Sequence, residues 1–292
     1  MTPPEARRTL PLPAGYDFLE SLRFLPLGGF DPTCRLGPRT FDRAARTPSG
    51  PVALRLRAQD GAVDAEAWGP GATWTVERVP SLLGLGDTPA AFTPSPPRLA
   101  RLARRARGVH LPRSPWVFDA LVRAVLQQRV TFRDATRAYR RLVRRLDEPA
   151  PGPLRLQLPL EPRHWLRLGG EDFRRTDVDG QRARALRAAA RVARAVDGAF
   201  AVADPAVARA RLAAVPGVGP WTSEMTMGFG LGDPDAVPVG DLHLPRLVAW
   251  ALAGETWADD ARMLALLEPY RGQRFRVIRL LHWPLTRPPG SS

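Results

Sequence analysis

The sequence predicts a mainly α-helical protein with an N-terminal α+β domain. Apolar and charged residues alternate over 52–57 and again over 63–67, and an Asp-Gly turn signal at 60–61 separates the two runs, which predicts a β-hairpin. From residue 98 onward the apolar residues recur at helical spacing instead. Because a proline-rich stretch over 94–97 separates the two patterns, we expect domains of residues 1–97 and 98–292.

Three more segments of the N-terminal domain have readable patterns. Residues 1–14 are rich in proline and arginine and are expected to fray. Residues 16–27 predict a short helix with Leu22 and Leu25 facing inward. Residues 74–79, Trp-Thr-Val-Glu-Arg-Val, predict a further strand.

Capping and turn signals divide the second domain into helices. Ser114-Pro115 predicts an N-cap followed by proline at the first position of a helix that runs to Gln128. Thr131 is expected to cap the next helix, whose outer face is rich in arginine. The remaining predicted elements are helices over 99–107, over 182–196 and from Asp204-Pro205 onward, with Val207 and Leu212 inward, and a proline-rich loop over 148–162.

The composition restricts the class of protein. The chain has 292 residues, of which 44% are apolar and 25% charged, as in ordinary globular proteins of about two domains. No stretch approaches the roughly 18 apolar residues of a membrane span, and the N-terminus lacks the apolar core of a signal peptide. We therefore expect a cytoplasmic protein without a membrane partner. The single cysteine, Cys34, excludes an internal disulfide, a four-cysteine iron–sulfur cluster and a cysteine zinc site.

The charge is strongly positive. The formal net charge is +14, and all 43 basic residues are arginine, since the chain contains no lysine. Such an excess favours a polyanionic partner, although a composition biased toward Arg, Ala, Pro and Gly is an alternative explanation. Because arginine is not an amine nucleophile at neutral pH, chemistry through a lysine Schiff base is excluded.

Residues 213–222 predict a hairpin between two helices. Gly217 and Gly219 permit left-handed backbone in a tight turn and let a ligand approach without meeting a Cβ. The next helix is expected to begin near Pro220, so that its free N–H groups and positive dipole end can bind a phosphate. An ordinary turn between helices with a glycine C-cap is the alternative.

Asp241 is the candidate catalytic carboxylate. It lies twenty residues after Trp221 and directly before an apolar helical segment. An aspartate is also a good N-cap at that place, and this role alone would account for it. The two roles are compatible, because capping would hold the carboxylate at a fixed point. His243, a single histidine in an apolar helix, is expected to be structural.

Residues 212–241 resemble the helix–hairpin–helix, glycine-proline-rich loop and aspartate signature of the DNA glycosylase superfamily, and most closely the monofunctional 3-methyladenine DNA glycosylase II family. In that family Trp-Thr-Ala follows the hairpin and the catalytic aspartate comes twenty residues after the tryptophan, as Asp241 follows Trp221-Thr222-Ser223 here. Bifunctional members carry a Schiff-base lysine where this chain has Trp221. The resemblance covers about residues 16–283 and implies two helical subdomains that flank a cleft.

The resemblance implies a role for each matching residue. Asp241 would be catalytic, and the hairpin would bind a DNA phosphate. Arg129 would be inserted into the DNA stack, where close relatives carry an apolar residue. The other implied sets are a base pocket of Trp221, Tyr270, Phe24 and Met225, phosphate contacts from Gly217, Gly219 and Thr222, and the carbonyls of Ala213, Val215 and Val218 for a monovalent cation bound only with DNA; no other cofactor is implied.

The implied reaction is hydrolysis of an N-glycosidic bond in double-stranded DNA. A stacked base must first be flipped out, and one carboxylate can then stabilise positive charge on the sugar and activate water. The implied substrates are alkylated bases of the 3-methyladenine and 7-methylguanine type, removed by a monomer associated with a prokaryotic nucleoid. Two alternatives stay open: a glycosylase for deaminated or oxidised purines, and a lesion-binding DNA protein without chemistry.

Overall fold

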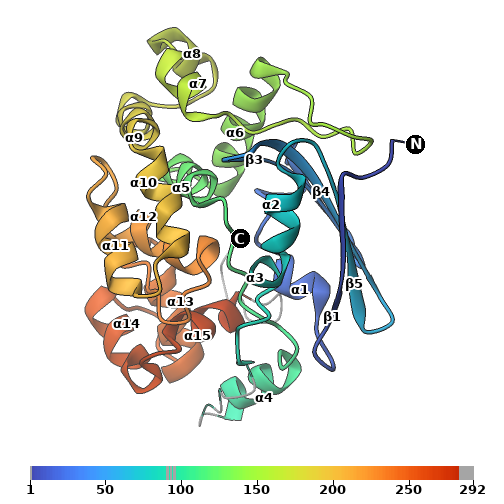
Figure 1. Ribbon diagram of the computed structural model, residues 1–292. Coiled ribbons are helices and arrows are strands. Elements are labelled where there is room, and N and C mark those ends of the chain that lie inside the picture. Colours follow the sequence, from blue (N-terminus) through green and yellow to red (C-terminus); the bar gives the residue numbers. More distant parts are fainter. Residues whose placement is uncertain (1, 90–91, 93, 95–96, 283–292) are drawn as a thin grey trace.

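A five-stranded antiparallel sheet lies beside a larger group of helices (Figure 1). The structure is a computed structural model that describes residues 2–89, 92, 94 and 97–282. Residues 95 and 96 of the expected domain boundary, and Trp283 at the end of the family resemblance, lie outside the described residues. No described helix is both long and apolar enough to cross a membrane.

The sheet has the strand order β1-β5-β4-β3-β2. Its strands are β1 (Ala6–Pro11), β2 (Cys34–Leu36), β3 (Thr40–Thr47), β4 (Gly50–Gln59) and β5 (Ala62–Trp68). The predicted hairpin over 52–67 is confirmed as β4 and β5, and the alternation explains its burial. Val52, Leu54 and Leu56 point into one core, whereas Arg55 and Arg57 on the opposite face pair with carboxylates of neighbouring strands.

Short helices cover the buried face of the sheet: α1 (Phe18–Leu22), α2 (Ala72–Glu77) and α3 (Val79–Leu82). The expected strand over 74–79 is therefore wrong. Ala72, Thr75 and Val76 are the buried residues of α2, and their spacing suits one face of a helix. In the predicted helix over 16–27, Leu22 is buried as expected, while Leu25 is only partly buried.

The N-terminal segment is not frayed, which corrects a second expectation. Ala6–Pro11 form the edge strand β1, paired with β5 from Ala6 opposite Ala67 to Pro11 opposite Ala62. Arg7 also pairs with Glu66 at 2.6 Å. Pro11 occupies the strand end, where a missing N–H costs little, so the proline-rich composition does not prevent pairing.

The other described elements are helical. They are α4 (Pro97–Arg105), α5 (Val117–Leu126), α6 (Phe132–Leu146), α7 (Pro162–Arg167), α8 (Gly170–Arg175), α9 (Gly180–Arg191), α10 (Ala193–Asp197), η2 (Gly198–Ala201), α11 (Pro205–Ala213), α12 (Pro220–Met225), the π-helical turn η3 (Thr226–Gly230), α13 (Leu244–Ala253), α14 (Asp260–Leu267), η4 (Glu268–Tyr270) and α15 (Arg274–Leu281).

Helix caps agree with most of the sequence signals. Thr131 caps α6 by accepting a hydrogen bond from the Asp134 N–H at 3.1 Å, and Asp204 caps α11 in the same way. The first signal is displaced: α5 begins at Val117 and ends at Leu126, and the Ser114 Oγ accepts the Trp116 N–H at 3.3 Å just before the helix. The predicted helix over 182–196 is interrupted at Val192, between α9 and α10. Val207 is 44% exposed, contrary to expectation, whereas Leu212 is buried.

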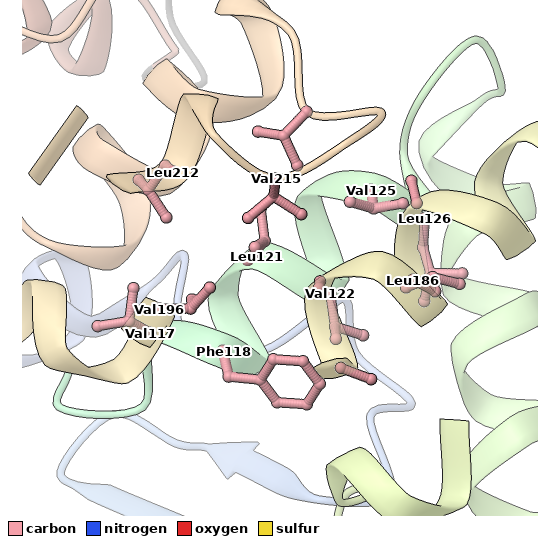
Figure 2. Close-up of a cluster of buried hydrophobic side chains, with 14 of the residues drawn as sticks. Val117, Phe118, Leu121, Val122, Val125, Leu126, Leu186, Val196, Leu212 and Val215 are labelled. Carbon is pink, nitrogen blue, oxygen red and sulfur yellow. The ribbon is translucent and has the colours of Figure 1, made fainter. Parts of the chain in front are cut away.

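Helix α5 runs through the centre of the helical core. Figure 2 shows its apolar side chains, among them Leu121 and Val125, beside Leu186 of α9, Leu212 of α11 and Val215 of the hairpin. The core around α5 therefore holds the hairpin in place. A separate core joins α4 to α13, α14 and α15. The predicted loop over 148–162 is confirmed, and its Leu154, Leu156 and Leu158 cover Trp68 and the second face of the sheet.

The polar side of α5 is tied to the sheet by a buried cluster of charges. Arg123 donates to Asp31 at 2.8 Å and to Asp119 at 2.8 Å. Arg43 of β3 pairs with Asp119 from the opposite side. Burial alone would raise the pKa of Asp119, but Arg123 and Arg43 together lower it below its usual value. The cluster thus remains ionised and positions α5 against the sheet.

Replacing Arg123 by methionine is expected to lower the free energy of unfolding by about 3–5 kcal/mol, because Asp31 keeps a buried charge without its partner. Urea denaturation measures the change. The matched control is Arg144→Met on the exposed face of α6, which should stay within about 0.5 kcal/mol of the parent. Equal stability of the two variants would contradict the role given to the cluster.

Candidate active site

The predicted hairpin over 213–222 joins helix α11 to helix α12, and its two glycines differ in backbone conformation. Gly217 has φ of +88°, and a Cβ there would lie 2.7 Å from the Ala185 Cβ. Gly219 has φ of −86° and ψ of −178°, an ordinary extended conformation, and a Cβ there would meet nothing. The expectation of left-handed backbone therefore holds for Gly217 only. The fold requires a glycine at 217, whereas the open space at 219 is available to an approaching ligand.

Gln128 connects the hairpin to the turn after α5. Its Nε2 donates to the Gly217 carbonyl at 3.0 Å and to the Thr222 Oγ1 at 2.8 Å. The resemblance implied that Thr222 contacts a phosphate. The residue is instead only 2% exposed, and its hydroxyl faces Gln128. The next residue, Arg129, is exposed and has φ of +55°, which is uncommon for a non-glycine residue. The turn therefore presents Arg129 beside the hairpin.

Asp241 is held by three hydrogen bonds. Its Oδ1 accepts the N–H groups of His243 and Leu244, each at 2.8 Å. Its Oδ2 accepts the Nε1–H of Trp221, also at 2.8 Å. The predicted capping role is thus present at the start of α13, and Trp221 and Asp241 are in direct contact. Because a carboxylate oxygen has two lone pairs, Oδ2 keeps one for another partner.

A large pocket opens beside this pair. Its volume is about 990 Å³, at the upper end of the roughly 300–1,000 Å³ typical of ligand sites. Trp221, Met225 and Phe229 line it from one side of α12 and η3, since they follow one another at intervals of four residues. The opposite walls come from Phe24 and from the sheet and α5. Of the residues expected at the base pocket, the structure brings together Trp221, Met225 and Phe24 around Asp241.

Tyr270 does not line this pocket, although the resemblance placed it there. It belongs to the core formed by α4, α13, α14 and α15, where its ring meets Phe92 edge-on at 6.2 Å. The η4 turn, which directly follows α14, carries Tyr270 toward that core. Arg129 also lies outside the pocket wall.

The Phe24 ring already has a cation beside it. The guanidinium of Arg279 lies 4.1 Å from the ring centroid, and burial lowers the pKa of Arg279 to about 9. The ring of Phe229 packs against Phe24 at 5.3 Å. Phe24 is therefore part of a packed aromatic group, and one part of its π surface is engaged by a positive charge.

Several pocket residues were not predicted from the sequence. Trp116, Phe229 and His282 add aromatic surface, while Asp119 and Arg123 of the buried charge cluster add a polar wall. Phe229 had a weak local signal, since it stands between two glycines in Gly228-Phe229-Gly230. Both glycines are required, because a Cβ at Gly228 would overlap the Phe275 ring and a Cβ at Gly230 would lie 2.8 Å from the Ala120 Cβ. No local motif marks the others.

Side chains do not form a metal site in the described part of the chain: no group of three or more His, Cys, Asp or Glu is close enough to hold an ion. The hairpin carbonyls are a different type of ligand. The Val215 carbonyl accepts the Val218 N–H at 2.9 Å, which leaves it a second lone pair.

Comparisons with known proteins agree with this architecture. No model of a known protein family matches the chain. Over 184 residues it is 35% identical to the probable bifunctional transcriptional activator/DNA repair enzyme AlkA of Mycobacterium tuberculosis, covering 58% of this chain and 34% of that protein. The chain thus spans about a third of the length of the curated relatives it matches.

Two solved structures match almost the whole chain. The 3-methyladenine DNA glycosylase from Archaeoglobus fulgidus superposes with a TM-score of 0.78 at 18% identity, over 94% of this chain and 96% of that one. MBOgg1 in complex with a low-affinity DNA ligand superposes with a TM-score of 0.71 at 13% identity, over 94% and 93%. The fold is therefore that of the helix–hairpin–helix DNA glycosylases. Together with the AlkA relative, these matches confirm the resemblance to 3-methyladenine DNA glycosylases.

The two hairpin glycines should respond differently to alanine. Gly217→Ala places an L-residue at positive φ, which costs about 1–2 kcal/mol, and its Cβ would overlap Ala185. Gly219→Ala adds a methyl group in open space at an ordinary φ, so the free energy of unfolding should stay within about 0.5 kcal/mol of the parent. Urea denaturation measures the free energy of unfolding of both variants. Equal losses of stability would contradict the different backbone conformations described for Gly217 and Gly219.

Proposed function

We propose that the protein is a monofunctional DNA glycosylase that removes alkylated bases of the 3-methyladenine and 7-methylguanine type. The observation that carries the proposal is the 2.8 Å hydrogen bond between Trp221 and Asp241 on the wall of a large pocket. An aromatic face and a carboxylate are thereby fixed at one place, beside the glycine hairpin. The AlkA relative and the superposed glycosylases support the same reaction class.

Damaged double-stranded DNA is the proposed partner. The net charge of +14 favours a polyanion, and the backbone amides at Gly217 and Gly219 would grip a phosphate without reading sequence. The duplex would lie across a cleft between two helical subdomains of residues 98–292. Arg129, exposed on the turn that Gln128 ties to the hairpin, would occupy the space left by the flipped base.

The base would enter the pocket and stack on Trp221, with Met225 and Phe24 at its sides. The hydrogen bond from Nε1 to Asp241 fixes the plane of the Trp221 ring, so the stacked base is held next to the carboxylate. Tyr270 has no part in this arrangement, because it packs in a different core.

Asp241 would perform the chemistry. As the N-glycosidic bond breaks, its electron pair leaves with the base and positive charge develops on the sugar. The Asp241 carboxylate stabilises that charge and accepts a proton from the water that adds to the sugar. A cationic alkylpurine is already a good leaving group, so no protein acid is required. Because the chain has no lysine, release ends in hydrolysis and not in a Schiff base.

A monovalent cation fits the hairpin as a bridge to the phosphate. The carbonyls of Ala213, Val215 and Val218 would hold it, and the free lone pair of the Val215 carbonyl is compatible with that role. The ion would supply positive charge for phosphate binding and would take no part in bond cleavage.

A second candidate function is removal of uncharged purines, such as deaminated ones. It is favoured by Arg279, whose charge lies 4.1 Å from the Phe24 ring. A cation already placed there weakens the attraction of that ring for a cationic base. Base release from duplexes that contain methylated, deaminated or oxidised purines would separate the two candidates.

Asp241→Asn is expected to bind duplex DNA normally and to lose base release by at least about a hundredfold, because the amide cannot stabilise the sugar cation or accept a proton. A gel-shift titration measures duplex binding, and the release of free base from methylated duplex measures the loss of activity. Asp64→Asn on the exposed side of β5 is the control for the same change of charge. Near-parental release by Asp241→Asn would overturn the assignment. If the parent itself releases no base, only DNA binding without chemistry remains.

Gly219→Ala should reduce affinity for duplex DNA by roughly tenfold, about 1.4 kcal/mol, because its methyl group would occupy the open space where the phosphate approaches. The control is Gly86→Ala, which also adds a Cβ in open space but away from the hairpin and the pocket wall. If Gly219→Ala and Gly86→Ala bound duplex DNA with equal affinity, the proposed phosphate contact at the hairpin would be wrong.

A further inference from the structure

His282 stands on the pocket wall at the C-terminal end of α15. Its ring meets Phe24 edge-on, with centroids 6.4 Å apart and an interplanar angle of 86°. The residue is exposed and lines the pocket. The proposed reaction does not use this imidazole.

A hydrogen bond determines the tautomer of His282. Its Nδ1 lies 2.8 Å from the Ile278 carbonyl oxygen, one turn earlier in α15. Because a carbonyl can only accept, Nδ1 must carry the hydrogen. In the neutral ring, Nε2 then has a lone pair and acts as a hydrogen-bond acceptor. The contact with Ile278 explains the orientation of Nδ1 but leaves Nε2 without a function.

The charges near His282 favour its neutral form. Burial lowers the pKa of the imidazole, and this effect exceeds the opposing contribution of the Ile278 hydrogen bond. The positive charge of Arg279 lowers the pKa further, while Asp241 raises it, and the balance lies below the usual value. The other ionisable groups nearby are Glu20, Arg23 and Arg276 around a smaller adjoining pocket that His282 also borders, and His243, Asp119, Arg35, Arg43 and Arg123 around the large one.

We propose that the Nε2 of His282 reads the flipped base by accepting an N–H from its edge. The inference rests on the proposed function and specifies its substrate class: purines that present an amino group or a ring N–H on the edge turned toward α15. If a base carried only acceptors on that edge, one of its lone pairs would face the lone pair of the His282 Nε2, and the two would repel each other. His282 is thus a specificity residue, whereas Asp241 carries the bond cleavage.

Two replacements separate hydrogen bonding from shape. His282→Gln keeps an acceptor, the amide oxygen, but cannot be protonated in this pH range. His282→Phe keeps a ring of similar size without an acceptor. His164→Gln is the matched control, because His164 lines neither pocket, burial also lowers its pKa, and glutamine can keep its place in the capping box of α7. Thermal unfolding of each variant verifies that it is folded.

The first measurement is single-turnover release of 7-methylguanine from duplex DNA between about pH 5 and pH 8, the range in which histidine titrates. His282→Phe should slow release by roughly tenfold to a hundredfold, since the N–H of the base loses its partner. His282→Gln should retain most of the rate. In the parent, release should fall as the pH drops through the lowered pKa of His282, because the imidazolium has no acceptor. His282→Gln should lack this decline, and His164→Gln should keep it.

The second measurement does not depend on catalysis. Calorimetric titration with free 3-methyladenine should show weaker binding to His282→Phe than to the parent, and near-parental binding to His282→Gln and His164→Gln. The inference would be overturned if His282→Phe bound 3-methyladenine as tightly as the parent and kept the parent's pH dependence of release. It would also be overturned if His282→Phe and His282→Gln lost affinity and release rate equally. If the parent binds the free base through His282 but releases none from DNA, the proposed function fails while the reading role survives.

Discussion

The placement of α5 depends on a buried pairing of charges. Arg123 binds Asp31 of the N-terminal region and Asp119 of its own helix, and Arg43 completes the cluster from β3. The apolar side of the same helix fills the centre of the helical core (Figure 2). One helix thus joins the sheet to the helices, and its small residues Ala120 and Ala124 line the pocket. Buried ion pairs contribute little net stability, but they strongly penalise a displaced partner, which suits a cluster that fixes one relative position.

Both carboxylate oxygens of Asp241 are held by hydrogen bonds. Its Oδ1 caps the turn into α13, and its Oδ2 holds the Trp221 indole. The capping bonds restrict the carboxylate to one rotamer, which is the preorganisation that stabilisation of a developing cation requires. The structural explanation of the residue therefore supports the proposed catalytic one.

The aromatic groups of the pocket show how far local patterns reach. Trp221 and Met225 line it as expected, because they precede Phe229 at helical spacing on one side of α12 and η3. Tyr270 directly follows α14 and packs against a different core. No neighbouring residue of 268–271 lines the pocket in its stead. Trp116 and His282 come from segments more than a hundred residues apart in the chain, so only folding brings them together. The strand β1 and the helix α2 were misjudged for a related reason, since pairing with β5 and packing on the sheet outweighed local composition.

The amino-acid sequence alone was sufficient to predict the glycine hairpin, the spacing from Trp221 to Asp241 and the lack of any lysine. These features are local or depend on residue identity alone, so periodicity, capping chemistry and composition suffice to recognise them. The folded structure was needed to show that Gly217 is required while Gly219 is free of backbone strain. It was also needed to show that Thr222 faces Gln128 and that Arg279 lies against Phe24. It also placed His282 on the pocket wall. These features depend on contacts between segments that are distant in the chain. Burial and charge determine those contacts, and they produce no periodic pattern in the sequence.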